Sequence, residues 1–177
     1  SVSASGIAVL EDHRWCALGM GFVAETNEVT RPTGPRKLVG AKVRLLNASS
    51  NALAIVDLPE GRSLALTPDH SWTVNHWNWV PSPAAPIKPE AAHVVVLQPG
   101  QVHEIHVSLK DPYWSVSKPE NPGAQPMAVA DFTQDWSRFR FEYRPPSAEA
   151  CAHLPHANLI WHGTLLSPAF TPTGSVD

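Results

Sequence analysis

Residues 136–144 read WSRFRFEYR, and this stretch decides the fold class. Phe139, Phe141 and Tyr143 alternate with charged residues along it. Because successive side chains of a β-strand point to opposite faces, the pattern predicts a strand with one buried aromatic face and one wet charged face. The same two-residue alternation occurs in residues 38–47, LVGAKVRLLN, where small and aliphatic residues share one face. The lysine and the arginine of this stretch fall on the other, wet face.

Comparable patterns and turn sequences divide much of the chain into short strands. Turn chemistry separates them at NASSN (47–51), PEGR (59–62), TPDH (67–70) and QPGQ (98–101), where Pro99 and Gly100 suit the centre of a type II turn. Helical periodicity is confined to 146–154, with Ser147 as its N-cap. The expected strands are 6–10, 20–25, 38–47, 52–58, 62–67, 71–79, 92–98, 102–109, 136–144 and 158–166.

Eight to ten short strands at this spacing predict an all-β fold, an antiparallel sandwich or barrel. The 177 residues suffice for one well-buried core, and no linker divides them, so we expect a single domain over 1–177. Proline is abundant, with 18 residues against 10 glycines, which suits a loop-rich β protein. Two long loops are expected, at 81–91 and 110–135.

Charge and composition exclude some partners and favour an exported protein. The net charge of −3 provides no cationic field for a phosphate backbone, so nucleic-acid binding is not expected. No apolar run reaches the ~18–20 residues that span a bilayer, so no transmembrane segment is expected. The small polar start, SVSASG, is typical of a mature N-terminus left by signal-peptide cleavage. We therefore expect a bacterial protein that is secreted, periplasmic or on the cell surface.

The chain has two cysteines, Cys16 and Cys151. In an oxidising compartment a disulfide between them is the natural interpretation. The alternatives are two buried thiols, or one thiol that reacts or binds metal.

LQPGQVHEIHV (97–107) resembles the L-x-P-G-x-x-Y-x-V-x-V corner of fibronectin type III domains. His103 stands where that pattern has its tyrosine, and an imidazole can make a similar anchoring hydrogen bond. The ending, RFRFEYRPP followed by NLIWHGTLLSPAF, is similar to the last two strands of bacterial secreted immunoglobulin-like domains. The resemblance implies an immunoglobulin-like β-sandwich and little about function.

No enzyme signature is present in the chain. There is no G-x-S-x-G, H-E-x-x-H, P-loop or Rossmann glycine pattern. His103-Glu104-Ile105-His106 has one residue too few for a zincin motif, and on a strand its two histidines would face opposite sides. We expect the protein not to be an enzyme.

The nine histidines make a metal site a competing hypothesis, since imidazole is the commonest transition-metal ligand. Cys151 and His156 lie as a Cys and a His do between the last strands of cupredoxins, which would make copper the cofactor. The neighbours His70-Ser71-Trp72 and His76-Trp77 are similar to copper sites of certain surface proteins of methane-oxidising bacteria. The candidate ligands are His70, His76, His103, His106, His153, His156 and His162.

Aromatic residues define a candidate binding surface. In HSWTVNHWNWV (70–80) the three tryptophans either pack in the core through a bulge, or lie under PSPAAPIKP, or bind a sugar or peptide. The surface would combine the 70–90 segment with the 110–130 loop. Its candidate residues are Trp72, Trp77, Trp79, Tyr113 and Trp114.

The sequence thus favours an exported, non-enzymatic binding or structural accessory module with a protein or cell-surface partner. Two alternatives remain open. One is a periplasmic or cell-surface copper-binding protein that uses the histidines. The other is an immunoglobulin-like protease inhibitor whose proline-rich loops enter an active site.

Overall fold

Strands account for most of the regular structure in the computed structural model, which describes residues 7–9, 17–26, 37–69, 80–81, 85–117, 125–131 and 138–171. The protein is all-β, as its sequence predicts, and its sheets are antiparallel. The strands are β1 (Ile7–Val9), β2 (Leu18–Thr26), β3 (Leu38–Asn47), β4 (Leu53–Val56), β5 (Leu64–Pro68), β6 (Val80–Pro81), β7 (Val94–Leu97), β8 (Val102–Ser108), β9 (Ser115–Ser117), β10 (Met127–Ala128), β11 (Phe139–Tyr143) and β12 (Leu165–Leu166). The helical turns are η1 (Pro59–Gly61), η3 (Ala91–His93), η4 (Val129–Asp131), α1 (Ala148–Cys151) and η5 (Ala157–Leu159).

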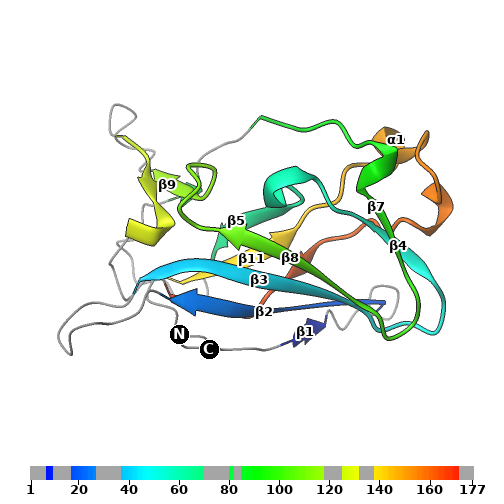
Figure 1. The fold of residues 1–177 in the computed structure, drawn as a ribbon, viewed down its shortest axis with the longest axis horizontal. Coiled ribbons are helices and arrows are strands. Elements are labelled where there is room, and N and C mark those ends of the chain that lie inside the picture. The colour runs from blue at the N-terminus through cyan, green and yellow to red at the C-terminus, as the bar shows by residue number, and fades with distance from the viewer. Residues whose placement is uncertain are drawn as a thin grey trace.

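One sheet has the strand order β1-β2-β3-β8 (Figure 1). Val43 of β3 lies between Phe22 of β2 and Ile105 of β8 in the register, and all three side chains are buried. The alternate residues Lys42 and Arg44 are exposed. The strand expected at 38–47 is therefore confirmed in both its bounds and its two faces.

The second sheet, β12-β11-β5, carries the aromatic strand. Phe139, Phe141 and Tyr143 are fully buried, while Arg140 and Glu142 between them are half-buried on the other face. The Tyr143 hydroxyl accepts a hydrogen bond of 2.9 Å from the backbone N–H of Val56 in β4. The alternation in WSRFRFEYR thus predicts the buried face correctly. The strand itself is shorter than expected and covers residues 139–143 instead of 136–144.

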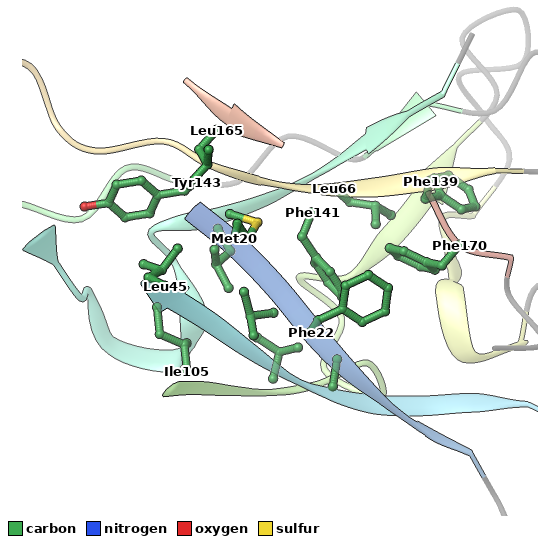
Figure 2. Packing of buried hydrophobic residues seen from close by; sticks show 14 of the residues in the cluster. Met20, Phe22, Leu45, Leu66, Ile105, Phe139, Phe141, Tyr143, Leu165 and Phe170 are labelled. Carbon is green, nitrogen blue, oxygen red and sulfur yellow. The ribbon is translucent and has the colours of Figure 1, made fainter. Parts of the chain in front are cut away.

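The buried faces of these two sheets pack against each other through aromatic rings (Figure 2). Phe22 of β2 meets Phe141 of β11 edge to face, with ring centroids 5.4 Å apart. Phe141 stacks on Phe170 at 4.8 Å. Trp114, which follows β8 in the chain, meets Phe141 from another side at 5.8 Å. Such geometries add to the free energy gained from burying the rings.

A short antiparallel pair, β4 and β7, lies beside two corners of the chain. The β3–β4 corner and the β7–β8 corner are joined by Asn47, whose backbone N–H donates to Gln101 and whose carbonyl accepts from Gly100. The predicted turn at 98–101 is confirmed by the 3.0 Å hydrogen bond from Gln101 N–H to the Gln98 carbonyl and by the positive φ of Gly100, 83°.

Two predicted segments differ from the structure. The segment expected as a loop at 110–135 contains two strands, β9 and β10, and the helical turn η4. Strand β9 pairs with β10 on one side and with β6 on the other. The strand expected at 158–166 is wrong over most of its length. Ile160 bridges Ala54 of β4, and only Leu165 and Leu166 pair with β11, so the chain changes neighbours within the segment.

Three further expectations can be compared with the described residues. The helix expected at 146–154 is confirmed as α1, with the Ser147 hydroxyl accepting a 3.1 Å hydrogen bond from the Ala150 N–H. Within the loop expected at 81–91, residues 85–90 have no regular structure. The strand expected at 71–79 lies outside the described residues.

Candidate ligand-binding cleft

The predicted metal ligands that belong to the described residues do not come together in the structure. On β8, His103 lies on the inner face beside Ile105, while His106 is exposed on the outer face. His153 and His156 are exposed on the segment after α1. No three His, Cys, Asp or Glu side chains come together as a metal site anywhere in the described residues, and the predicted histidine cluster is not formed there.

The remaining predicted ligands are separately placed. His162 is half-buried, and its Nδ1 lies 3.0 Å from the carbonyl oxygen of Pro146. His70 and His76 lie outside the described residues.

His103 anchors the corner that follows β7. Its Nε2 lies 2.8 Å from the Asp57 carboxylate, and both side chains are about a quarter exposed, at 25% and 28%. The imidazole therefore makes an anchoring hydrogen bond, and its partner is a carboxylate on the segment after β4.

Cys151 carries a free thiol at the end of α1, so the predicted disulfide with Cys16 is not formed in the structure. Its side chain is buried with Val56, Leu154 and Ile160 in a second apolar cluster, beside the main core. Burial raises the pKa of the thiol, which keeps it protonated and unreactive. Cys16 lies outside the described residues.

The two described aromatics of the predicted binding surface have different environments. Trp114 is 1% exposed and packs in the core, so assigning its indole to the surface was wrong. Tyr113, the next residue back, is half-buried and reaches the surface. Trp72, Trp77 and Trp79 lie outside the described residues.

Tyr113 lines an open cleft of about 680 Å³. Four segments meet there: the η1 turn, the stretch 85–89, the turn before β9, and the chain from the end of β11 into α1. In Figure 1 the green segment that leads into β7 crosses the upper side of the view toward α1. The described lining residues are Leu58, Arg62, Ala85, Pro86, Ile87, Lys88, Pro89, Tyr113, Arg144, Pro146, Ser147 and Ala150.

The turn PEGR (59–62) places Arg62 in this cleft. Glu60 and Gly61 both have left-handed backbone conformations, with φ of 58° and 70°. A Cβ on Gly61 would lie 2.8 Å from Cγ1 of Val107, so this position requires glycine for space as well as conformation. The sharp turn lays the Arg62 guanidinium over the Tyr113 ring, 4.1 Å from its centroid, in a cation–π contact.

Tyr113 is fixed at both of its ends. Its hydroxyl donates a 2.7 Å hydrogen bond to the Leu64 carbonyl, and its backbone N–H donates to the Asp111 carboxylate at 2.9 Å. Burial raises the pKa of the Tyr113 phenol although the nearby Arg62 and Arg144 guanidiniums act to lower it. Tyr113 is therefore a rigid neutral platform beside two cations.

Arg144 is held from the strand side by Glu142. Its Nη2 donates to Glu142 Oε2 at 2.7 Å, and the Thr67 hydroxyl donates to the same oxygen at 2.6 Å. Burial by itself would raise the pKa of Glu142, but these two hydrogen bonds outweigh it and the pKa is lowered. The hydrogen bond to Glu142 also raises the pKa of Arg144. The pair is thus fully charged at neutral pH.

The other walls of the cleft are apolar and stiff. Pro86, Pro89 and Pro146 restrict the backbone on two sides. Ile87 packs against the second apolar cluster, and Pro89 is buried, so the stretch 85–89 is attached to the body of the protein.

Part of this cleft was predicted from the sequence, and its charges were not. The 70–90 segment and Tyr113 were expected on one surface, and the structure brings 85–89 and Tyr113 together. Arg62, Lys88 and Arg144 were not among the predicted residues. For Arg62 the sequence did contain an indication: the arginine directly follows the glycine of the PEGR turn, and a tight turn restricts the direction of the side chain that follows it.

Comparison with protein-family models, with curated proteins and with solved structures gives no match for this chain. The helices in the described segments are all too short or too polar to cross a membrane.

Proposed function

We propose that the protein is an exported, non-enzymatic immunoglobulin-like β-sandwich module that binds a partner through the cleft. Strand order supports the immunoglobulin-like assignment. In that fold strands A, B and E share one sheet, and C, F and G share the other. With β2, β3, β5, β8, β11 and β12 taken as A, B, C, E, F and G, the strands of both sheets have this neighbour order, and β1 is an additional strand at the edge of the first sheet.

The cleft itself carries the functional proposal. At about 680 Å³ it falls within the roughly 300–1,000 Å³ typical of small-ligand sites. Prolines stiffen its walls, and Tyr113 is hydrogen-bonded in place, so little ordering entropy is lost on binding. The cleft thus suits a small molecule or one group on a larger cell-surface or protein partner.

The chemistry of the lining favours binding over catalysis. Among the described lining residues there is no His, Asp, Glu or Cys to act as a general base or nucleophile. The Ser147 hydroxyl serves as the N-cap of α1, and the Tyr113 hydroxyl donates to a backbone carbonyl. Because 85–89 packs against the protein body, the stretch suits a wall better than a protruding inhibitory loop.

The test is to record ¹⁵N–¹H spectra of labelled protein with a panel of small anionic, neutral and cationic fragments. We expect shifts clustered around Arg62, Tyr113 and Ala150. Ala150→Trp should fill the cleft and abolish these shifts. Ala152→Trp is the matched control, because Ala152 is exposed next to the same short helix and does not line the cleft.

Two outcomes would contradict the proposal. Either no fragment of any charge shifts the residues of the cleft, or Ala150→Trp and Ala152→Trp bind fragments equally well. Ala150→Trp must keep the wild-type spectrum away from α1, which shows that the fold survives.

A further inference from the structure

We propose that the ligand of this cleft carries an oxyanion head group, a carboxylate or a phosphate, on a short apolar body. The inference rests on the proposed function, since it names the ligand class of the same cleft. Three cations, Arg62, Lys88 and Arg144, line the cleft, and none of the described lining residues is acidic. These are three of only 13 lysines and arginines in a chain with a net charge of −3, so positive charge is concentrated locally.

Arg62 supplies the main argument because its guanidinium has no hydrogen-bond acceptor among the described residues. Its Nε is buried without a partner. Its Nη2 lies 3.7 Å from the Glu60 carboxylate, which is beyond hydrogen-bonding distance, and Glu60 is largely exposed. Burying a charged donor without an acceptor costs stability. Nε itself is closed off from solvent, and the exposed 23% of the side chain lies outside it. An oxyanion in the cleft would therefore accept from the Nη groups, which a planar guanidinium can offer as two hydrogen bonds.

Arg144 and Lys88 extend the same charge around the cleft. Arg144 uses its Nη2 for Glu142 yet remains 60% exposed, so further guanidinium donors are accessible. Lys88 is exposed and forms no ion pair with any described residue. The cation–π contact with Tyr113 holds Arg62 in place without using its N–H donors.

The rest of the lining indicates the nature of the ligand body. Leu58, Ile87 and the prolines at 86, 89 and 146 present carbon to the cleft. One face of the Tyr113 ring is occupied by Arg62, which limits its use for stacking a sugar. An aliphatic or proline-like body next to a single anionic group matches both kinds of lining.

The experiment compares hexanoate, hexanamide and hexyl phosphate, titrated into the labelled 177-residue chain at one pH and ionic strength. We expect at least one of the two anions to shift the cleft residues with an affinity roughly tenfold or more above that of hexanamide, the neutral isostere. Arg62→Met and Lys88→Met should each weaken binding of the anion and leave the affinity for hexanamide unchanged. Lys42→Met removes an exposed cation from β3, away from the cleft, and should change neither.

The outcomes separate this inference from the proposed function. Equal binding of hexanamide and both anions overturns the oxyanion head group while leaving the cleft as a ligand site. Loss of anion binding in Lys42→Met to the same degree as in Arg62→Met also overturns it, because the effect would then come from net charge. Stronger binding of hexanoate or of hexyl phosphate identifies which head group the cleft prefers.

Discussion

Asn47 and Arg62 are two polar side chains held in place by turns, and their surroundings are opposite. Asn47 is fully buried, and its side chain makes four hydrogen bonds: its Nδ2 donates to the carbonyls of Asn51 and Leu97, and its Oδ1 accepts from the N–H and hydroxyl of Ser49. The Arg62 side chain is partly buried at the cleft and donates no hydrogen bond to any described residue.

This difference in hydrogen bonding distinguishes a residue that stabilises the fold from a residue that is available to a ligand. The Asn47 amide joins the β3–β4 and β7–β8 corners, which lie together at the lower right of Figure 1, and no polar group of that side chain remains for a ligand. The guanidinium donors of Arg62 lack acceptors among the described residues. This lowers the stability of the fold slightly and leaves donors available to a ligand. Fully paired buried polar groups support the fold, and unpaired ones beside a cleft indicate a site.

The largest effect is expected from Asn47→Ala. The variant should lose about 2–3 kcal/mol of unfolding free energy, because it leaves the Leu97 carbonyl buried without its donor and removes the side-chain hydrogen bonds to Ser49 and Asn51. Urea denaturation followed by tryptophan fluorescence measures the change.

Asn51→Ala is the control, since the Asn51 side chain is exposed and the hydrogen bonds there involve its backbone N–H and carbonyl. It should cost less than about 0.5 kcal/mol. If Asn47→Ala were equally mild, Asn47 would not be the structural joint that its contacts indicate.

A smaller, pH-dependent effect is expected from Glu142→Gln. The pKa of Glu142 is lowered in the folded protein, so its contribution is complete above its unfolded pKa and is lost as the pH falls through the folded value. The variant should be about 1 kcal/mol less stable than wild type at pH 7, and the difference should shrink below about pH 4. Urea denaturation at pH 7 and at pH 3 measures both differences.

Glu104→Gln is the matched control for Glu142→Gln. Glu104 pairs with Arg44 at 3.1 Å on the outer face of the first sheet, where both side chains are more than two-fifths exposed, at 42% and 49%. An exposed pair of this kind contributes little, so Glu104→Gln should change stability only slightly at either pH. A Glu142→Gln deficit that stays the same at pH 3 would show that the carboxylate charge is not what stabilises the fold.

The smallest stability effect is expected from Arg62→Met. Methionine follows the arginine side chain as far as the Nε position, where a methyl group replaces the unpaired buried donor, and its flexible apolar chain can pack beside the Tyr113 ring. The unfolding free energy should change by no more than about 0.5 kcal/mol in either direction, as the lost cation–π contact and the removed unpaired donor offset each other. A loss above about 1.5 kcal/mol in urea denaturation would place Arg62 with Asn47 as a structural residue.

Much of the fold could be predicted because it depends on local periodicity. The strand at 38–47, the buried face of 139–143, the Ser147 cap and the turn at 98–101 all follow from short-range sequence rules. Most of the expected strand at 158–166 failed because Ile160 pairs with β4 and Leu165 with β11, a change of neighbour that no periodicity encodes.

The candidate site was less predictable, since its residues come from four distant segments. The many histidines predicted a metal cluster, but the described histidines do not come together. On β8 successive side chains point to opposite faces, so His103 and His106 lie on different sides of the sheet. Trp114 and Tyr113 are adjacent, and no local pattern distinguishes the one that enters the core from the one that faces the cleft.

By itself the sequence determined the all-β class, the inward faces of the main strands and several turns, because each depends on residues a few positions apart. Tertiary structure alone decided that Arg62, Lys88 and Arg144 would share one cleft, that the Cys151 thiol would be buried and free, and that Asn47 would join two corners. The physical reason is that charge concentration and the pairing of polar groups depend on distances between segments, which a linear pattern does not contain.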